Sequence, residues 1–369
     1  MKKFLLYLFI LVLPLLILLP VPLFFFYETG EISTFDSHLR QLKEKQLFGI
    51  AYSGISREYK FHMVDTYKPE IIALGTSRSL EIESNIFNPT YSFYNAGVAA
   101  QNVRDLYTFV HKLSYDPKLI VIDINHFWFN SSRKPGPEAT YDVPKLDVTN
   151  IFLSCFKFYG DVFVGKIVPQ KLFANENIGI AGRFKEDGFT RTGSYNYGYY
   201  KHDPSKNKDY NFTETMRRIK LHKGRFEACN QMDKRVVVFI QNFVNECKNR
   251  NIKVLAFIPP FAPMVYDRMI KDGNYQYIGQ IYDNIKDLFD NENYFIYDYT
   301  DVRSLGGAKN EDFIDGFHAG VIVNNLIFKD ISSRNPNVEQ YFVNCEEIDS
   351  INWDYNMNNP KLHNFRRNY

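Results

Sequence analysis

The sequence predicts an α/β fold in which helices cover both faces of a parallel five-stranded sheet. Short apolar runs recur along the chain, and Gly, Pro or a polar residue ends each of them, as in buried strands. Stretches with helical spacing of apolar residues separate these runs, and that alternation is typical of a parallel sheet. Of the 369 residues, 45% are hydrophobic, which is enough for a sizeable core.

The strands are expected, in chain order, at residues 71–74, 91–94, 119–124, 252–258 and 294–297. Helices are expected at residues 102–113, 235–249, 278–289 and 319–332. In the first of these helices, Val103, Leu106 and Val110 fall on one face, which predicts that this face packs on the sheet.

The N-terminal segment has no charged residue from Phe4 to Phe26, which is long enough to cross a bilayer as a helix. Lys2 and Lys3 precede it, and because basic residues tend to stay in the cytoplasm, the rest of the chain is expected outside. A cleavable signal peptide is the alternative, but no small-residue cleavage site follows the segment. We therefore expect a single-pass anchor over residues 1–27, with the lipid bilayer as its partner.

The remaining chain divides into three parts by composition. Residues 28–68 are mixed and polar and predict a stalk that docks on the domain, which covers residues 69–333. Residues 130–233, rich in Gly, Pro, Asn and Tyr, predict a long insertion between the third and fourth strands. Its tyrosines could stack on sugar rings or only cover the surface. Residues 334–369 predict a polar tail.

Charge and cysteine content exclude some functions. A net charge of +2 without a concentrated basic patch argues against a nucleic-acid partner. The cysteines form no Cys-x-x-Cys pair, so neither a zinc site nor a thioredoxin-like motif is indicated, and their pairing stays open. They are Cys155, Cys229, Cys247 and Cys345.

A serine motif, Gly75-Thr76-Ser77-Arg78-Ser79, directly follows the first strand. A Ser at the carboxyl end of a parallel strand, ahead of a helix, lies where open α/β sheets bind ligands. There its backbone N–H and the helix N-terminus could face an oxyanion. Taken alone, the motif fits a helix cap better than a nucleophile.

A histidine motif, Asp315-Gly316-Phe317-His318, lies between the fifth strand and the last helix. An Asp three residues before a His can bond one ring nitrogen, which leaves the other free to take a proton from a serine hydroxyl. Taken alone, this motif also fits a surface turn.

Two further strand ends carry candidate donors. Asn95-Ala96-Gly97 follows the second strand, and a Gly there lets the backbone approach a ligand. Asp123-Ile124-Asn125-His126 ends the third strand, where the Asn125 amide could donate to the same ligand. A turn glycine and a polar strand end are the alternatives. His126 could serve as a spare base, although its place at the strand end favours a structural role.

The order of these residues resembles the SGNH (GDSL-like) hydrolase superfamily, whose four blocks carry Ser, Gly, Asn and His on a three-layer αβα, flavodoxin-like fold. The resemblance covers about residues 69–333. It implies Ser77 as nucleophile, with His318 as its base and Asp315 orienting that base. The backbone N–H groups of Ser77 and Gly97, with the Asn125 amide, would form the oxyanion hole.

The chain departs from the usual family blocks at two places. Position 76 is Thr where the family usually has Asp, and Asp123-Ile124-Asn125-His126 replaces Gly-x-Asn-Asp. The layout is similar to the membrane-tethered, cell-envelope members that take part in teichoic-acid D-alanylation and polysaccharide O-acetylation.

The resemblance therefore implies a membrane-anchored esterase or O-acyltransferase that acts on an acylated cell-envelope glycan or polymer through an acyl-serine. This chemistry needs no metal and no cofactor. Arg78 would contact an anionic group of the substrate or pair with a carboxylate inside the fold.

Three alternatives come from other functional classes. One is a catalytically inactive SGNH-like module that binds glycans, and another is a scaffold subunit of a multi-pass membrane acyltransferase. The third is a cytoplasmic nucleotide-binding protein. The sequence argues against it because no Gly-rich phosphate loop is present.

Overall fold

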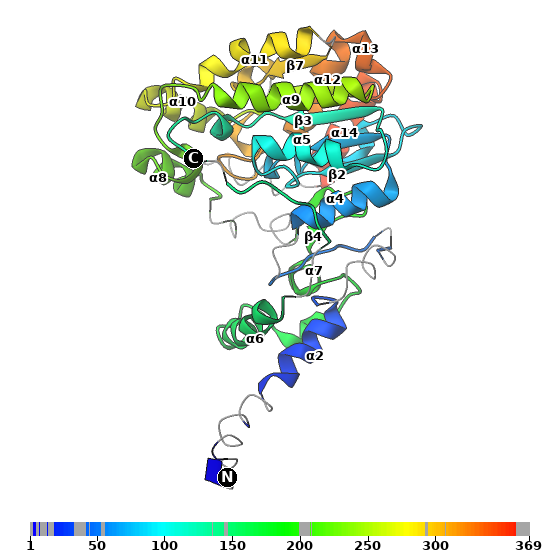
Figure 1. The fold of residues 1–369 in the computed structure, drawn as a ribbon, viewed down its shortest axis with the longest axis vertical. Coiled ribbons are helices and arrows are strands. Elements are labelled where there is room, and N and C mark those ends of the chain that lie inside the picture. The colour runs from blue at the N-terminus through cyan, green and yellow to red at the C-terminus, as the bar shows by residue number, and fades with distance from the viewer. Residues whose placement is uncertain are drawn as a thin grey trace. The chain divides into compact units, whose positions relative to one another are not determined.

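A computed structural model describes residues 18–32, 45–52, 56–134, 136–143, 147–198, 209–291, 294–306 and 308–358, and isolated positions outside these ranges (Figure 1). The chain forms two compact units. The first comprises residues 1–55, 143–191 and 195–199, and the second comprises residues 56–142, 192–194 and 200–369.

The second unit contains a parallel five-stranded sheet with the strand order β2-β1-β3-β6-β7. Its strands are β1 (Ile71–Leu74), β2 (Phe93–Ala96), β3 (Leu119–Asp123), β6 (Lys253–Ile258) and β7 (Phe295–Asp298). Counted within the sheet alone, this is the order 2-1-3-4-5 of doubly wound folds. The winding reverses between β1 and β3, which is where such sheets bind ligands.

The predicted strands are confirmed to within two residues at their ends. β1 and β3 are apolar along their length because both of their faces are buried. The edge strand β7 is only partly buried. The α/β class and the parallel five-stranded sheet follow directly from these runs.

The predicted helices are present, and they pack in two groups. In the first group, α9 (Arg235–Asn249) lies between α5 (Val103–Lys112) and α11 (Ile281–Asp290), as Figure 1 shows. In the second group, α12 (Val321–Arg334) contacts α13 (Pro336–Glu339) and α14 (Cys345–Asn358). This arrangement is consistent with a three-layer αβα fold.

Shorter elements complete the second unit. Its other α-helices are α4 (Ser56–Tyr67), α8 (Thr213–Leu221) and α10 (Pro263–Asp272). The 3₁₀ turns are η1 (Ser77–Ser79), η2 (Ser84–Ile86), η3 (His126–Trp128), η7 (Gly224–Phe226), η8 (Ile278–Gln280), η9 (Val302–Leu305) and η10 (Asn310–Asp312).

Two predicted boundaries differ from the structure. The stalk expected over residues 28–68 ends early, because α4 buries Tyr59, Met63 and Val64 in the second unit. The tail expected from residue 334 continues as α13 and α14, in which Val338 and Ile348 are buried. In α4 the buried residues include Lys60, so the sequence shows no continuous apolar face there.

The first unit is built from α2 (Pro20–Thr29), α6 (Val148–Phe163), η4 (Pro169–Phe173), α7 (Ile180–Lys185) and the hairpin of β4 (Asp187–Phe189) and β5 (Tyr195–Tyr197). Phe26, Phe158 and Leu172 lie at its centre. The insertion predicted over residues 130–233 is therefore divided. Residues 143–191 fold with the N-terminal segment, while α8 and its flanking residues belong to the second unit.

Among the described residues, no helix is both long and apolar enough to cross a membrane. Within the predicted anchor, residues 4–26, positions 5–6, 8–12 and 14–17 lie outside the described residues. Its last part forms α2, where Phe25 and Phe26 pack on Phe158 of α6. These two aromatic side chains, which the anchor prediction placed in lipid, therefore contact protein.

Candidate active site

Ser77, His318 and Asp315 form a chain of hydrogen bonds at the carboxyl edge of the sheet. Ser77 Oγ lies 2.8 Å from His318 Nε2, although 241 residues separate them in the sequence. The other ring nitrogen, Nδ1, lies 2.8 Å from Asp315 Oδ2 and 3.0 Å from Oδ1. Both distances are within proton-transfer reach, so the three side chains have the geometry of a catalytic triad.

The serine lies in one 3₁₀ turn, η1, directly after β1. The Thr76 hydroxyl accepts the Arg78 N–H and begins this turn, which leaves Ser77 partly exposed between buried neighbours. Where the sequence predicted a helix, only this 3₁₀ turn follows the serine, and the side-chain amide of Asn95 donates to the carbonyls of Ser79 and Ile82 at 2.7 and 2.8 Å.

The histidine lies in a tight loop that its own aspartate organises. Asp315 Oδ1 accepts the backbone N–H groups of Phe317 and His318, each at 2.8 Å. Desolvation acts to raise the pKa of Asp315. The charge and hydrogen bond of His318 and these two backbone donors outweigh it and lower the pKa to about 2. Asp315 is therefore an anion at neutral pH and orients the imidazole.

A buried carboxylate, Asp123, supports the serine turn from β3. It accepts the Thr76 N–H at 3.0 Å and the Thr76 hydroxyl at 3.1 Å. A Cβ at Gly75 would lie 1.8 Å from Asp123 Oδ1, so only Gly allows this approach. Burial raises the pKa of Asp123 to about 7, against the opposing effects of Thr76, Asn125 and Arg78.

The expected oxyanion donors differ in what they contact. In the described part of the chain, the Ser77 backbone N–H has no hydrogen-bond partner. The Gly97 N–H donates to Asn95 Oδ1 at 2.7 Å, and Asn125 Nδ2 donates to Thr76 Oγ1 at 3.0 Å. The Asn125 amide therefore has a second N–H that could bind a substrate oxygen. The Gly97 N–H could do so only by breaking its hydrogen bond to Asn95.

Arg78 is enclosed by protein, with 2% of its surface exposed. Its guanidinium lies 4.9 Å from the ring of Phe261 and 4.5 Å from that of Phe317, and it donates to the Pro260 carbonyl. Burial lowers its pKa to about 9, and Asp123 and Asp315 oppose this shift. Two roles were expected for Arg78, contact with the substrate and pairing inside the fold. Its burial fits the role inside the fold better, although it contacts two rings and a carbonyl rather than a carboxylate.

His126 makes structural contacts with a backbone carbonyl and an aromatic ring. Its Nε2 lies 3.1 Å from the Arg225 carbonyl oxygen, and its ring packs on Phe261. Burial lowers its pKa well below the usual range, so it stays neutral.

Sequence reasoning missed two residues that shape the site, Asn95 and Asp123. Each is the polar residue at or near the end of an otherwise apolar strand, and each is fully buried. A buried polar group needs partners, so a polar residue inside a strand-like run is the signal that could have found them.

Comparison with known proteins adds no family assignment. No protein-family model matches the sequence, and no curated protein is detectably similar to it.

Proposed function

We propose that this chain is a serine esterase or O-acyltransferase of the SGNH type. The observation that carries the proposal is the hydrogen-bonded chain from Ser77 Oγ through the His318 ring to Asp315. The position of the serine after β1, next to the switch point of a doubly wound sheet, supports it.

In the proposed reaction, His318 Nε2 takes the Ser77 proton while Oγ attacks an ester or thioester carbonyl. The free Ser77 N–H and the second N–H of Asn125 stabilise the tetrahedral oxyanion. The leaving oxygen or sulfur departs with the proton from His318, and an acyl-serine remains. Water then resolves it in an esterase, or a sugar hydroxyl does so in a transferase, with His318 again removing the proton.

The proposed substrate is an acylated cell-envelope glycan or polymer. This assignment rests on the resemblance to the envelope members of the superfamily and on the apolar segment from Phe4 to Phe26. That segment would hold the catalytic unit at the outer face of the membrane, with the N-terminus in the cytoplasm and a multi-pass acyltransferase as partner. Fusion of residues 1–32 to a reporter active only outside the cytoplasm tests this location.

One observation favours a second candidate, an inactive SGNH-like module that binds glycans. The Gly97 N–H is already bonded to Asn95, so one of the three expected oxyanion donors is occupied. In this case Ser77→Ala would leave the biological function intact.

The deciding experiment treats the full chain with a serine-reactive fluorophosphonate and with p-nitrophenyl acetate. We expect labelling and hydrolysis that Ser77→Ala abolishes. Ser79→Ala is the matched control, because its hydroxyl donates to the Thr76 carbonyl and, among the residues that the structure describes, bonds no imidazole. Labelling that persists in Ser77→Ala places the nucleophile elsewhere, and no labelling in the wild type favours the binding module.

A further inference from the structure

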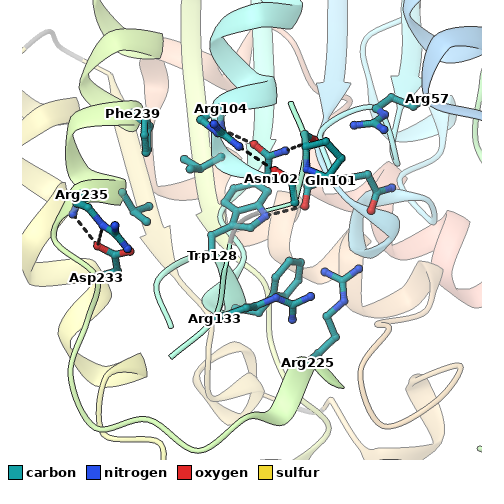
Figure 2. Close-up of a pocket in the computed structure, with 15 residues that line it drawn as sticks. Arg57, Gln101, Asn102, Arg104, Trp128, Arg133, Arg225, Asp233, Arg235 and Phe239 are labelled. Atoms are coloured by element: carbon teal, nitrogen blue, oxygen red, sulfur yellow. Dashed lines mark hydrogen bonds and ion pairs between the residues drawn. The ribbon is translucent and has the colours of Figure 1, made fainter. Parts of the chain in front are cut away.

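A pocket of about 310 Å³ lies in the second unit and is lined mainly by arginine and aromatic side chains (Figure 2). This volume suits a group about the size of one sugar or smaller. Its arginines are Arg57, Arg104, Arg133, Arg225 and Arg235, and Asp233 is the one acidic residue among the lining residues.

Two of these arginines are neutralised by carboxylates. Arg235 forms an ion pair with Asp233 at 2.7 Å, and Arg57 lies 3.5 Å from Asp105. Each pair leaves little net charge at its arginine.

Arg133 and Arg225 are different, because both stack on one aromatic ring. The guanidinium of Arg225 lies 3.8 Å from the ring centroid of Phe127, and that of Arg133 lies 5.2 Å from it. Figure 2 shows the two side chains next to each other, apart from the Asp233–Arg235 pair. Within the described residues, neither forms an ion pair with a carboxylate.

The charge of Arg133 acts on the neighbouring Arg225. Burial, together with the charges of Arg133 and Arg218, lowers the pKa of Arg225 to about 10, and Asp123 opposes this shift. The guanidinium of a third cation, Arg104, donates to the neutral Gly136 carbonyl and lies 6.0 Å from the ring of Phe239, and its buried Nε has no hydrogen-bond partner in the described part of the chain. An anion in the pocket would relieve the repulsion and satisfy these donors.

The pocket adjoins the candidate active site through two segments of chain. The backbone N–H groups of Val98 and Ala100, just before the pocket residue Gln101, donate to the carbonyls of Thr76 and Gly75 at 3.0 Å each. The ring of Phe127 lies 6.3 Å from that of Phe317, the neighbour of His318.

We propose that this pocket binds an anionic group, a phosphate or a carboxylate, carried by the glycan substrate, and that Arg133 and Arg225 are its main ligands. The inference rests on the proposed function and specifies its substrate as an anionic polymer. Guanidinium groups suit both anions because their paired N–H donors match two oxygens. The bound group would place the neighbouring acyl ester at Ser77.

The test measures binding to the full chain by titration calorimetry at constant ionic strength. Inorganic phosphate and glucuronate are the two probes, and uncharged glucose is the control ligand. We expect at least one anion to bind, and its affinity identifies whether phosphate or carboxylate is the natural group. Arg225→Gln and Arg133→Gln should each weaken binding at least tenfold.

Two control variants separate charge from folding. Arg225→Lys keeps the charge and should retain part of the affinity, and Arg217→Gln, whose arginine pairs with Glu214 on α8, should retain all of it. Binding of neither anion, or equal binding to the wild type and Arg225→Gln, overturns the inference.

The catalytic proposal has a separate readout. Arg217→Gln, which alters an exposed arginine outside the pocket and the candidate active site, should hydrolyse the neutral ester p-nitrophenyl acetate within about twofold of the wild type. Anion binding without fluorophosphonate labelling would refute the proposed catalysis and leave the pocket assignment intact. Labelling without anion binding would refute the pocket assignment alone.

Discussion

The two sides of the candidate active site differ in what their polar groups contact. On the proton-transfer side, Ser77, His318 and Asp315 bond one another and need no rearrangement. On the oxyanion side, the Gly97 N–H and one N–H of Asn125 bond other protein groups. In the proposed mechanism, proton transfer is therefore ready before substrate binds, whereas full oxyanion stabilisation depends on how these donors respond to the substrate.

The largest effect is expected from Asp315→Asn on the proton-transfer side. The amide cannot hold the imidazole in the required tautomer, so kcat for ester hydrolysis should fall by roughly 10³- to 10⁴-fold. The matched control is Asp272→Asn, which alters a second His–Asp pair, with His222 at 3.0 Å, outside the site. Equal activity in Asp315→Asn and Asp272→Asn would remove Asp315 from the mechanism.

A pH-dependent effect is expected from Asp123, which supports the oxyanion side. Its folded-state pKa of about 7 is raised from the usual 3.8, so its contribution to stability is present below about pH 4 and is lost as the pH rises to 7. Asp123→Asn does not ionise, so its stability should not fall in this way as the pH rises. Relative to the wild type, the variant should gain up to about 4 kcal/mol of unfolding free energy between pH 4 and pH 8.

Urea unfolding of both proteins at several pH values measures this gain. Asp267→Asn, which alters an exposed carboxylate, is the control and should show no such trend. A constant difference between wild type and Asp123→Asn at all pH values would contradict the assignment.

The next effect concerns whether Asn125 serves catalysis or only supports Thr76. If its second N–H binds the oxyanion, Asn125→Ala should lower kcat by about 100-fold, since one such donor contributes about 3 kcal/mol. KM should change little. An unchanged kcat, with circular dichroism showing a folded protein, would leave the Ser77 N–H as the main donor.

The smallest effect is expected from Gly75→Ala, which tests how closely Asp123 packs under the serine turn. The added methyl group would overlap Asp123 Oδ1 and should cost about 1–3 kcal/mol of unfolding free energy. Gly279→Ala is the control, because no atom lies within 4 Å of its added Cβ. Destabilisation of both variants to the same degree would argue against the close contact.

The sheet and its main helices were predictable because their signal is local. The runs at residues 71–74 and 119–124 are apolar on both faces, and the helical spacing at residues 102–113 matches α5 (Val103–Lys112) closely. Helix α4 was missed because buried polar side chains such as Lys60 break its apolar pattern. The first unit was missed because residues 143–191 fold against the N-terminal segment, far away in sequence.

The sequence by itself determined the order of the polar motifs along the chain. Each of Ser77, Gly97, Asn125 and His318 comes after an apolar run, and burial of that run places it in the sheet. Only the tertiary structure decided which of their polar groups bond one another and which stay free. The pairing of Ser77 with His318 joins residues that are 241 positions apart in the sequence. The state of the Gly97 N–H depends on Asn95, whose side chain accepts it. Local pattern carries no information about such competition, because a hydrogen-bond partner is chosen by position in the folded chain.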